Sequence, residues 1–146
     1  MATDITVFSR AFMKSDVHDG DIKMITAHIR NIVSAEVNTL VPIPWENVRL
    51  VKVIAAVTEV IDNVGDWELD FELNAAAGTE MMTISITKNS AVGAVFESTT
   101  SSEAACAGLS AAIAARDAIN IESDGAATPT GAVNLYFYFE PELDTV

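Results

Sequence analysis

The stretch Trp67-Glu68-Leu69-Asp70-Phe71-Glu72-Leu73 decides the fold, because apolar and acidic residues alternate in it without a break. Successive side chains of a β-strand point to opposite faces of its sheet, so the four apolar residues share one face and the three acids share the other. The pattern therefore predicts a strand with one buried face and one solvated face, as is common in antiparallel sheets.

Similar alternation recurs along the chain, between short segments that have the composition of turns. We expect about eight strands, over residues 24–32, 37–43, 48–61, 67–74, 80–87, 91–98, 118–123 and 132–140. In the last of them one face is apolar (Val133, Leu135, Phe137, Phe139) and the other is mixed (Asn134, Tyr136, Tyr138). Many short strands with close turn signals predict an all-β fold, and we expect an antiparallel, jelly-roll-like β-sandwich.

Three segments give more specific expectations. Pro42 and Pro44 remove two backbone donors, so the strand over 37–43 should lie at a sheet edge or end at a bend. The strand over 48–61 is apolar on both faces, which favours a central position, and a turn over 62–66 should return the chain as a hairpin into residues 67–74. A capping-box pattern and an alanine-rich run predict one short helix or compact loop near residues 100–116.

The N-terminal segment differs from the rest of the chain, because its apolar residues are scattered among polar ones and it ends in a loop-like composition. We expect two parts: an extended N-terminal arm over residues 1–23 and a β-sandwich domain over residues 24–146. Apolar residues on an arm of an acidic protein suit contact with a partner. The candidate anchors are Ile5, Val7, Phe8, Phe12 and Met13.

Charge limits the classes of partner. The formal net charge is −13, from 21 acidic and eight basic residues. We therefore expect binding neither to nucleic acid nor to an anionic membrane surface, since both attract Lys and Arg.

No apolar run approaches the ~20 residues of a membrane-spanning helix, and the N-terminus has no signal-peptide pattern. Cys106 is the only cysteine, so an internal disulfide is impossible.

A search for a nucleophile gives two weak candidates. Ser110 lies in Gly-Leu-Ser-Ala-Ala, which lacks the final glycine of a nucleophile elbow, and both histidines (His18 and His28) precede it in the chain. Cys106 lies among alanines, where a buried and inert thiol is the common case. We therefore expect no catalytic residue in this part of the chain.

Metal ligands and paired carboxylates are equally weak candidates. Asp16, Asp19 and Asp21 offer oxygen ligands for calcium, but their spacing misses the EF-hand pattern. The three acids of residues 68–72 lie about 6.5–7 Å apart at successive positions on one strand face, a spacing that glycoside hydrolysis can use. A solvated strand face explains them as well, so we expect no metal, no cofactor and no enzymatic activity.

Three aromatic residues are further candidates for an interface. Tyr136 and Tyr138 are expected to point outward from the last strand, and Trp45 follows the two prolines. Together they would suit stacking on a sugar, but outward aromatic residues more often mark protein interfaces or cross-strand pairs. We therefore list Trp45, Tyr136 and Tyr138 with the arm residues as candidate interface residues.

Residues 31–57 (Asn-Ile-Val-Ser-Ala-Glu-Val-Asn-Thr-Leu-Val-Pro-Ile-Pro, then Val-Arg-Leu-Val-Lys-Val-Ile-Ala-Ala-Val) resemble the start of small head decoration, or cement, proteins of tailed bacteriophages. The downstream order is also similar, with Met82-Thr-Ile-Ser-Ile86 and then residues 117–125, which end in Ser-Asp-Gly. Arg116-Asp117 replaces the Gly-Asp pair that commonly opens that strand in such proteins. The likeness covers residues 31–140 and rests on strand pattern and turn residues.

The resemblance implies a structural virion protein that binds the major capsid protein, reinforces the outer surface of the head and forms a homotrimer. Its place would be the outside of the capsid, after synthesis in the host cytoplasm. Three other functions remain open from the sequence: a carbohydrate- or receptor-binding β-sandwich module, a structural protein of the phage tail, and a hydrolase that uses the Ser110 region or the carboxylates.

Overall fold

A computed structural model describes residues 4–11, 23–30, 36–45, 48–61, 65–73, 79–100, 118–124 and 130–141. These residues form ten strands and no helix. The strands are β1 (Asp4–Ala11), β2 (Lys23–Arg30), β3 (Glu36–Pro42), β4 (Val48–Glu59), β5 (Trp67–Leu73), β6 (Thr79–Ile86), β7 (Val95–Glu97), β8 (Thr99–Thr100), β9 (Ala118–Asp124) and β10 (Ala132–Pro141).

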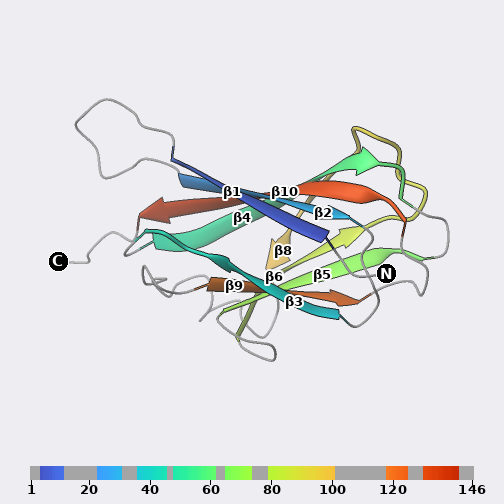
Figure 1. The fold of residues 1–146 in the computed structure, drawn as a ribbon. Helices are drawn as coiled ribbons and strands as arrows, with labels where there is room; N and C mark the ends of the chain where they lie inside the picture. The colour runs from blue at the N-terminus through green and yellow to red at the C-terminus, as the bar shows by residue number, and fades with distance from the viewer. Residues whose placement is uncertain are drawn as a thin grey trace.

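The strands form two five-stranded sheets that pack as two layers (Figure 1). The first sheet has the order β1-β2-β10-β4-β7 and the second has the order β3-β9-β5-β6-β8. Every pairing is antiparallel. The orders β2-β10-β4-β7 and β3-β9-β5-β6 are those of a jelly roll, so the expected β-sandwich is confirmed.

The core lies between the two sheets and follows the predicted alternation. On β10 the inward residues Val133, Leu135, Phe137 and Phe139 have no exposed surface. On β5 the inward residues Trp67, Leu69 and Phe71 are at most 1% exposed. Phe71 meets Phe137 across the core edge to face, with ring centroids 5.2 Å apart. The apolar faces of the two sheets therefore bury each other, as the period of two predicts.

The predicted hairpin between residues 48–61 and 67–74 is wrong. β4 pairs with β10 and β7 in the first sheet, whereas β5 pairs with β6 and β9 in the second. The chain therefore changes sheets between β4 and β5. A turn composition predicts that the chain reverses, but it carries no information about which strand then becomes the neighbour.

Two predictions about β3 and β4 have different outcomes. β3 ends at Pro42, and among the described strands it pairs with β9 alone, which confirms the edge position. β4 is a partly central strand, but it is not buried on both faces: Arg49 and Lys52 are exposed. A β-bulge at Val51 shifts the phase of the strand, so that Leu50 is buried together with Val53 while Val51 is half-buried and faces outward with Ile54.

β6 also contains a bulge, and the predicted wet face of β5 is partly buried. Met81 and Met82 of β6 are both buried where the register between β5 and β6 shifts. Glu72, expected to be solvated, is only 7% exposed, and its Oε2 lies 3.4 Å from Nδ2 of Asn120, which donates to it. Asp70 is half-buried and Glu68 is exposed, so the acidic face becomes drier toward the end of the strand.

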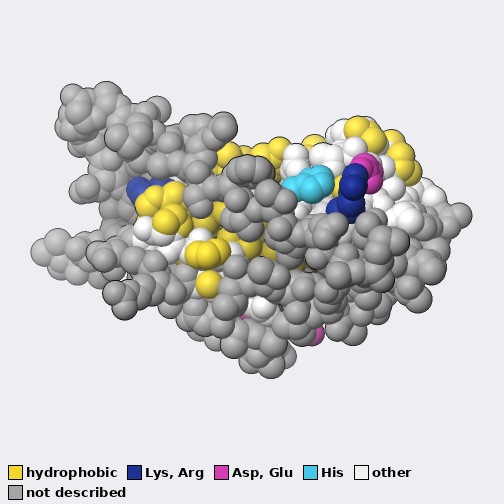
Figure 2. Space-filling model, viewed as in Figure 1, with side chains coloured by type: hydrophobic (Ala, Val, Ile, Leu, Met, Phe, Trp, Pro, Cys, Tyr) yellow, Lys and Arg dark blue, Asp and Glu magenta, His cyan; other side chains and the backbone are white. Residues whose placement is uncertain are grey.

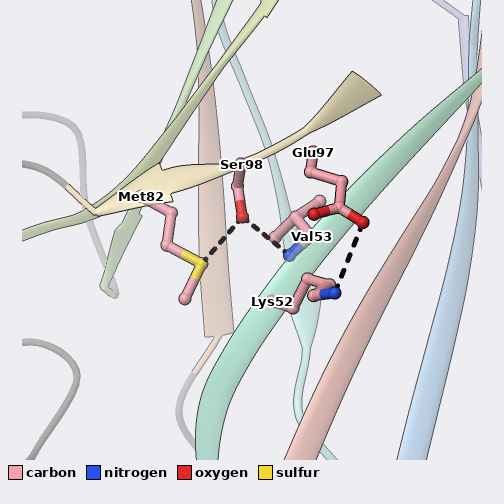
Figure 3. A network of polar contacts seen from close by, with 5 residues as sticks. All are labelled: Lys52, Val53, Met82, Glu97 and Ser98. Atoms are coloured by element: carbon pink, nitrogen blue, oxygen red, sulfur yellow. Dashed lines mark hydrogen bonds and ion pairs between the residues drawn. The ribbon is translucent and has the colours of Figure 1, made fainter. Parts of the chain in front are cut away.

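The short strands β7 and β8 form one segment that passes from the first sheet to the second. β7 pairs with β4 and β8 pairs with β6, and Ser98 lies between them. The Ser98 backbone nitrogen donates to the Val53 carbonyl at 2.9 Å, and the Ser98 hydroxyl accepts from the Val53 nitrogen at 2.9 Å. Figure 3 shows this hydroxyl between Val53 and the sulfur of Met82, which is 3.3 Å away.

The segment expected as an N-terminal arm contains β1, which pairs along its whole length with β2 at the edge of the first sheet. The register places Ile5, Val7 and Phe8 opposite Ile29, Ala27 and Thr26. Residues 4–11 are therefore part of the sandwich. Phe12 and Met13 lie outside the described residues. Of the helix or loop expected near residues 100–116, Thr100 belongs to strand β8 and residues 101–116 lie outside the described residues.

Candidate functional site: the outer face of the first sheet

The outward residues of β2, β10 and β4 lie side by side in cross-strand rows. In one row Thr26, Tyr136 and Ile54 are directly opposite one another, and in the next row Met24, Tyr138 and Lys52 are. Because opposite residues of neighbouring strands contact each other on one face, the two tyrosines pack among the side chains of β4. Met24 is buried, with 7% of its surface exposed. We call the remaining surface, made of Thr26, His28, Val51, Lys52, Ile54, Asn134, Tyr136 and Tyr138, the tyrosine face.

Polar groups at one end of the tyrosine face are paired with each other. Nδ1 of His28 lies 2.7 Å from Oδ1 of Asn134, and both side chains are half-buried. Arg30 and Glu59, which lie opposite Ala132 on either side of β10, form an exposed ion pair at the same end of the face. In the view of Figure 2, hydrophobic side chains are exposed between polar ones, with a histidine next to a basic and an acidic side chain.

A hollow of about 250 Å³ lies on the tyrosine face, over the bulge of β4. It is lined by Val51, Lys52 and Ile54 of β4 and by Tyr138 and Glu140 of β10. Most of these were missed from the sequence, although one signal was present: the charged Lys52 interrupts an otherwise apolar run, which marks an outward position in β4.

The two sheets differ sharply in charge. The strands of the first sheet contain five basic and four acidic residues (Arg10, Lys23, Arg30, Arg49, Lys52; Asp4, Glu59, Glu97, Glu140). The strands of the second sheet contain seven acidic residues (Glu36, Glu68, Asp70, Glu72, Glu80, Glu122, Asp124) and no lysine or arginine. The negative charge of these strands is therefore concentrated in one layer of the sandwich.

Hydroxyl groups line part of the acidic layer. The Thr83 hydroxyl lies 2.7 Å from Oδ1 of Asp70 and 3.0 Å from Oε1 of Glu80, and the Ser85 hydroxyl lies 3.5 Å from Oε2 of Glu68. Asp66 accepts a hydrogen bond from the backbone nitrogen of Lys88 at 2.9 Å, as expected for a turn residue. Within the described ranges, no three His, Cys, Asp or Glu side chains are grouped in a way that would hold a metal ion.

The structure does not bring the three candidate aromatic residues together. Trp45 packs on the core residue Phe139, with ring centroids 5.7 Å apart. Phe139 faces the second sheet, whereas its neighbour Tyr138 faces outward. Trp45 is thus on the core side of β10, and a sugar-stacking patch of all three residues is not formed. Tyr136 and Tyr138 remain as a pair on one face.

Several other candidates from the sequence lie outside the described residues. These are His18, Cys106, Ser110 and the aspartates at positions 16, 19 and 21. The part of the chain that is described contains no helix long and apolar enough to cross a membrane.

Comparison with known proteins gives no family. No family model matches the chain, and no curated protein matches it. Among solved structures, it is similar to a glycoside hydrolase family 43 arabinoxylan arabinofuranohydrolase from Bacillus subtilis in complex with cellotetraose, with a TM-score of 0.39, 15% identity and 81% of this chain covered. The chain spans 22% of the length of that enzyme.

It is also similar to CsCBM6-3 from Clostridium stercorarium in complex with cellobiose, with a TM-score of 0.33 and 12% identity, over 94% of this chain and 87% of that one. Superpositions this loose carry no argument about function. The two-sheet architecture rests on the strands of this chain itself.

Proposed function

We propose that this chain is a structural virion protein that decorates the outside of a phage head and binds the major capsid protein through the tyrosine face. The observation that carries the proposal is the difference between the two layers. The tyrosine face combines half-buried aromatic and aliphatic side chains with paired charges, whereas the strands of the other layer contain only acidic charged residues.

The energetics of desolvation decide which layer meets the partner. Moving a carboxylate out of water costs several kcal/mol unless a basic partner compensates for it, and the strands of the second layer contain no lysine or arginine. Aromatic residues and arginine are enriched in protein interfaces, and acidic residues are depleted there. The tyrosine face therefore faces the capsid, and the acidic layer faces solution. Many acidic faces on one shell repel those of the next particle and keep particles apart.

The kind of partner comes from the resemblance of residues 31–140 to head decoration proteins. Such a protein needs a rigid body, a contact surface and no active site. The sandwich provides the rigid body, and the tyrosine face provides the surface. We further propose that the protein forms a homotrimer on the outer capsid surface and has no enzymatic activity.

Co-sedimentation with phage heads assembled without this chain tests the proposal. Wild-type protein should bind such heads in hundreds of copies, while a tail component would be bound in far fewer. The double variant Tyr136→Ser/Tyr138→Ser should lose most of the binding. The matched double variant Glu68→Gln/Asp70→Asn on the acidic layer should retain it. Loss of binding in the acidic-layer variant only would contradict the assignment of the two faces.

The anchoring role of Ile5, Val7, Phe8, Phe12 and Met13 stays a prediction. Deletion of residues 1–20 would also remove the edge strand β1, so it cannot separate anchoring from folding. Single substitutions of Phe12 and Met13 by serine avoid this problem because they leave β1 in place. Unchanged head binding by both variants would count against an anchor at the C-terminal end of the arm.

A second candidate function is recognition of a carbohydrate or receptor, and one observation favours it. Tyr138 borders the hollow, and the His28–Asn134 pair offers polar groups on the same face. Tyrosine rings present apolar surface with a polar tip, which suits a sugar. Binding of the purified protein to a glycan array, lost in Tyr138→Ser, would favour this function over capsid decoration.

A further inference from the structure

The hollow is a consequence of the bulge in β4. Lys52 is opposite Tyr138 and Leu50 is opposite Phe139, so Val51 is an extra residue with no counterpart on β10. A bulge bends its strand and re-aims the side chains around it. Here it leaves Val51 half-buried and Lys52 exposed at the same side of the sheet, next to Ile54. The opening is therefore fixed by the backbone of the sheet.

The charges around the hollow are already paired. Nζ of Lys52 lies 3.4 Å from Oε1 of Glu97, as Figure 3 shows, and a guanidinium nitrogen of Arg49 lies 3.2 Å from Oε2 of Glu140. Both pairs are close to half exposed, so they form a polar rim. The walls between them are the apolar parts of Val51, Ile54 and Tyr138. A charged ligand would have to compete with these pairs, whereas an apolar group would not.

The size of the hollow favours a protein side chain over a free small molecule as its occupant. Its volume of about 250 Å³ is below the roughly 300–1,000 Å³ of most small-molecule sites. A small molecule that is buried on one side only gains little contact area. A side chain carried by a partner protein gains the same contact and has the surrounding sheet face as additional interface, as in the central pockets of protein interfaces.

We infer that the hollow receives one large apolar side chain of the protein against which the tyrosine face docks. The inference rests on the proposed function and adds to it the kind of residue that the capsid partner presents: a leucine, methionine or aromatic residue within a neutral surface. Lys52 and Glu140 then lie at the edge of the contact and contribute to its orientation rather than to its strength.

Substitution inside the hollow tests the inference with heads assembled without this chain as the probe. Ile54→Asp places a carboxylate against the incoming side chain and should weaken binding at least tenfold, the scale of a central interface residue. Ile54→Ala, which removes apolar contact without adding charge, should weaken it less. Val92→Asp is the matched control, because Val92 is 61% exposed in the connection before β7 and lies outside both the hollow and the tyrosine face. It should bind like the wild type.

A photo-crosslinking amino acid at position 54, followed by mass mapping of the adduct, identifies the occupant. A crosslink to an apolar residue of the capsid protein supports the inference. Heads that bind wild type, Ile54→Asp and Val92→Asp equally would overturn it and leave the proposed function intact. A crosslink from position 54 to a glycan, or none at all in bound particles, would also overturn it. Failure of the wild type to bind heads would reject the proposed function itself. Circular dichroism and a thermal melt of each variant separate loss of binding from loss of folding.

Discussion

The hydroxyl of Ser98 accepts a hydrogen bond from the backbone nitrogen of Val53 at 2.9 Å, at the point where the chain leaves the first sheet for the second. A side chain here replaces the backbone carbonyl that a regular β-ladder would supply. The bond therefore continues the pairing of β4 one position beyond the end of β7.

Replacing Ser98 by alanine should lower the free energy of unfolding by about 1–3 kcal/mol, because the Val53 amide loses its partner in a partly buried position. Urea denaturation followed by tryptophan fluorescence measures the change. Thr99→Ala is the matched control, since Thr99 is exposed and its hydroxyl lies 3.4 Å from the Thr83 carbonyl. Equal effects of the two substitutions would show that the Ser98 hydroxyl has no special role.

Phe137→Ala should lower the free energy of unfolding by about 3–5 kcal/mol, because it empties a fully buried position that packs edge to face on Phe71. Tyr136→Ala, one residue earlier and facing outward, should have a much smaller effect. Thermal denaturation of both variants checks the assignment of the two faces of β10. A larger loss for Tyr136→Ala would mean that the tyrosine face is covered within the folded chain.

Gly131→Ala should destabilise the protein more than Gly93→Ala. Both glycines have a positive φ, +115° and +91°, where a side chain is strained by about 1–3 kcal/mol. A Cβ at Gly93 meets nothing within 4 Å, but a Cβ at Gly131 would lie 2.8 Å from the Val60 carbonyl oxygen. The difference between the two melting temperatures measures the clash. Equal melting temperatures would show that the backbone near Val60 moves aside at little cost.

Removing the ion pair between Lys52 and Glu97 should change stability by at most about 1 kcal/mol, since both side chains are close to half exposed or more. A double-mutant cycle with Lys52→Met and Glu97→Gln measures the coupling, which should decrease further in high salt. A coupling well above this limit, and insensitive to salt, would indicate that the rim of the hollow is shielded from water.

Most of the fold could be predicted because apolar and polar residues alternate without a break in the strands that form the centre of the core. Residues 67–71 and 133–139 alternate cleanly, and their inward side chains are the inward ones in the structure. In β4 and β6, bulges interrupt the alternation, so the rule that every second residue faces inward fails there. The extra residue at Val51 reverses the phase of β4, and the extra residue Met81 of β6 places two neighbouring methionines in the core, because a pattern of side chains does not show where one strand gains a residue.

The candidate site was only half visible in the sequence. Tyr136 and Tyr138 could be placed on one outward face from their spacing alone. Their grouping with Trp45 failed because the loop after β3 turns the indole toward Phe139 on the opposite side of β10. The hollow depends on the bulge and on which strand becomes the neighbour of β4, and both are set by long-range pairing that no local pattern specifies.

The crossing from β7 to β8 has a mechanical consequence. One continuous segment is hydrogen-bonded to β4 on one side of Ser98 and to β6 on the other, so it connects the two sheets at that edge. A force that separates the two sheets at this edge acts on the hydrogen bonds of the β4–β7 and β6–β8 pairs together. These bonds therefore do not break one after another. Resistance to tearing at this edge should therefore exceed what the five residues of β7 and β8 suggest from their length.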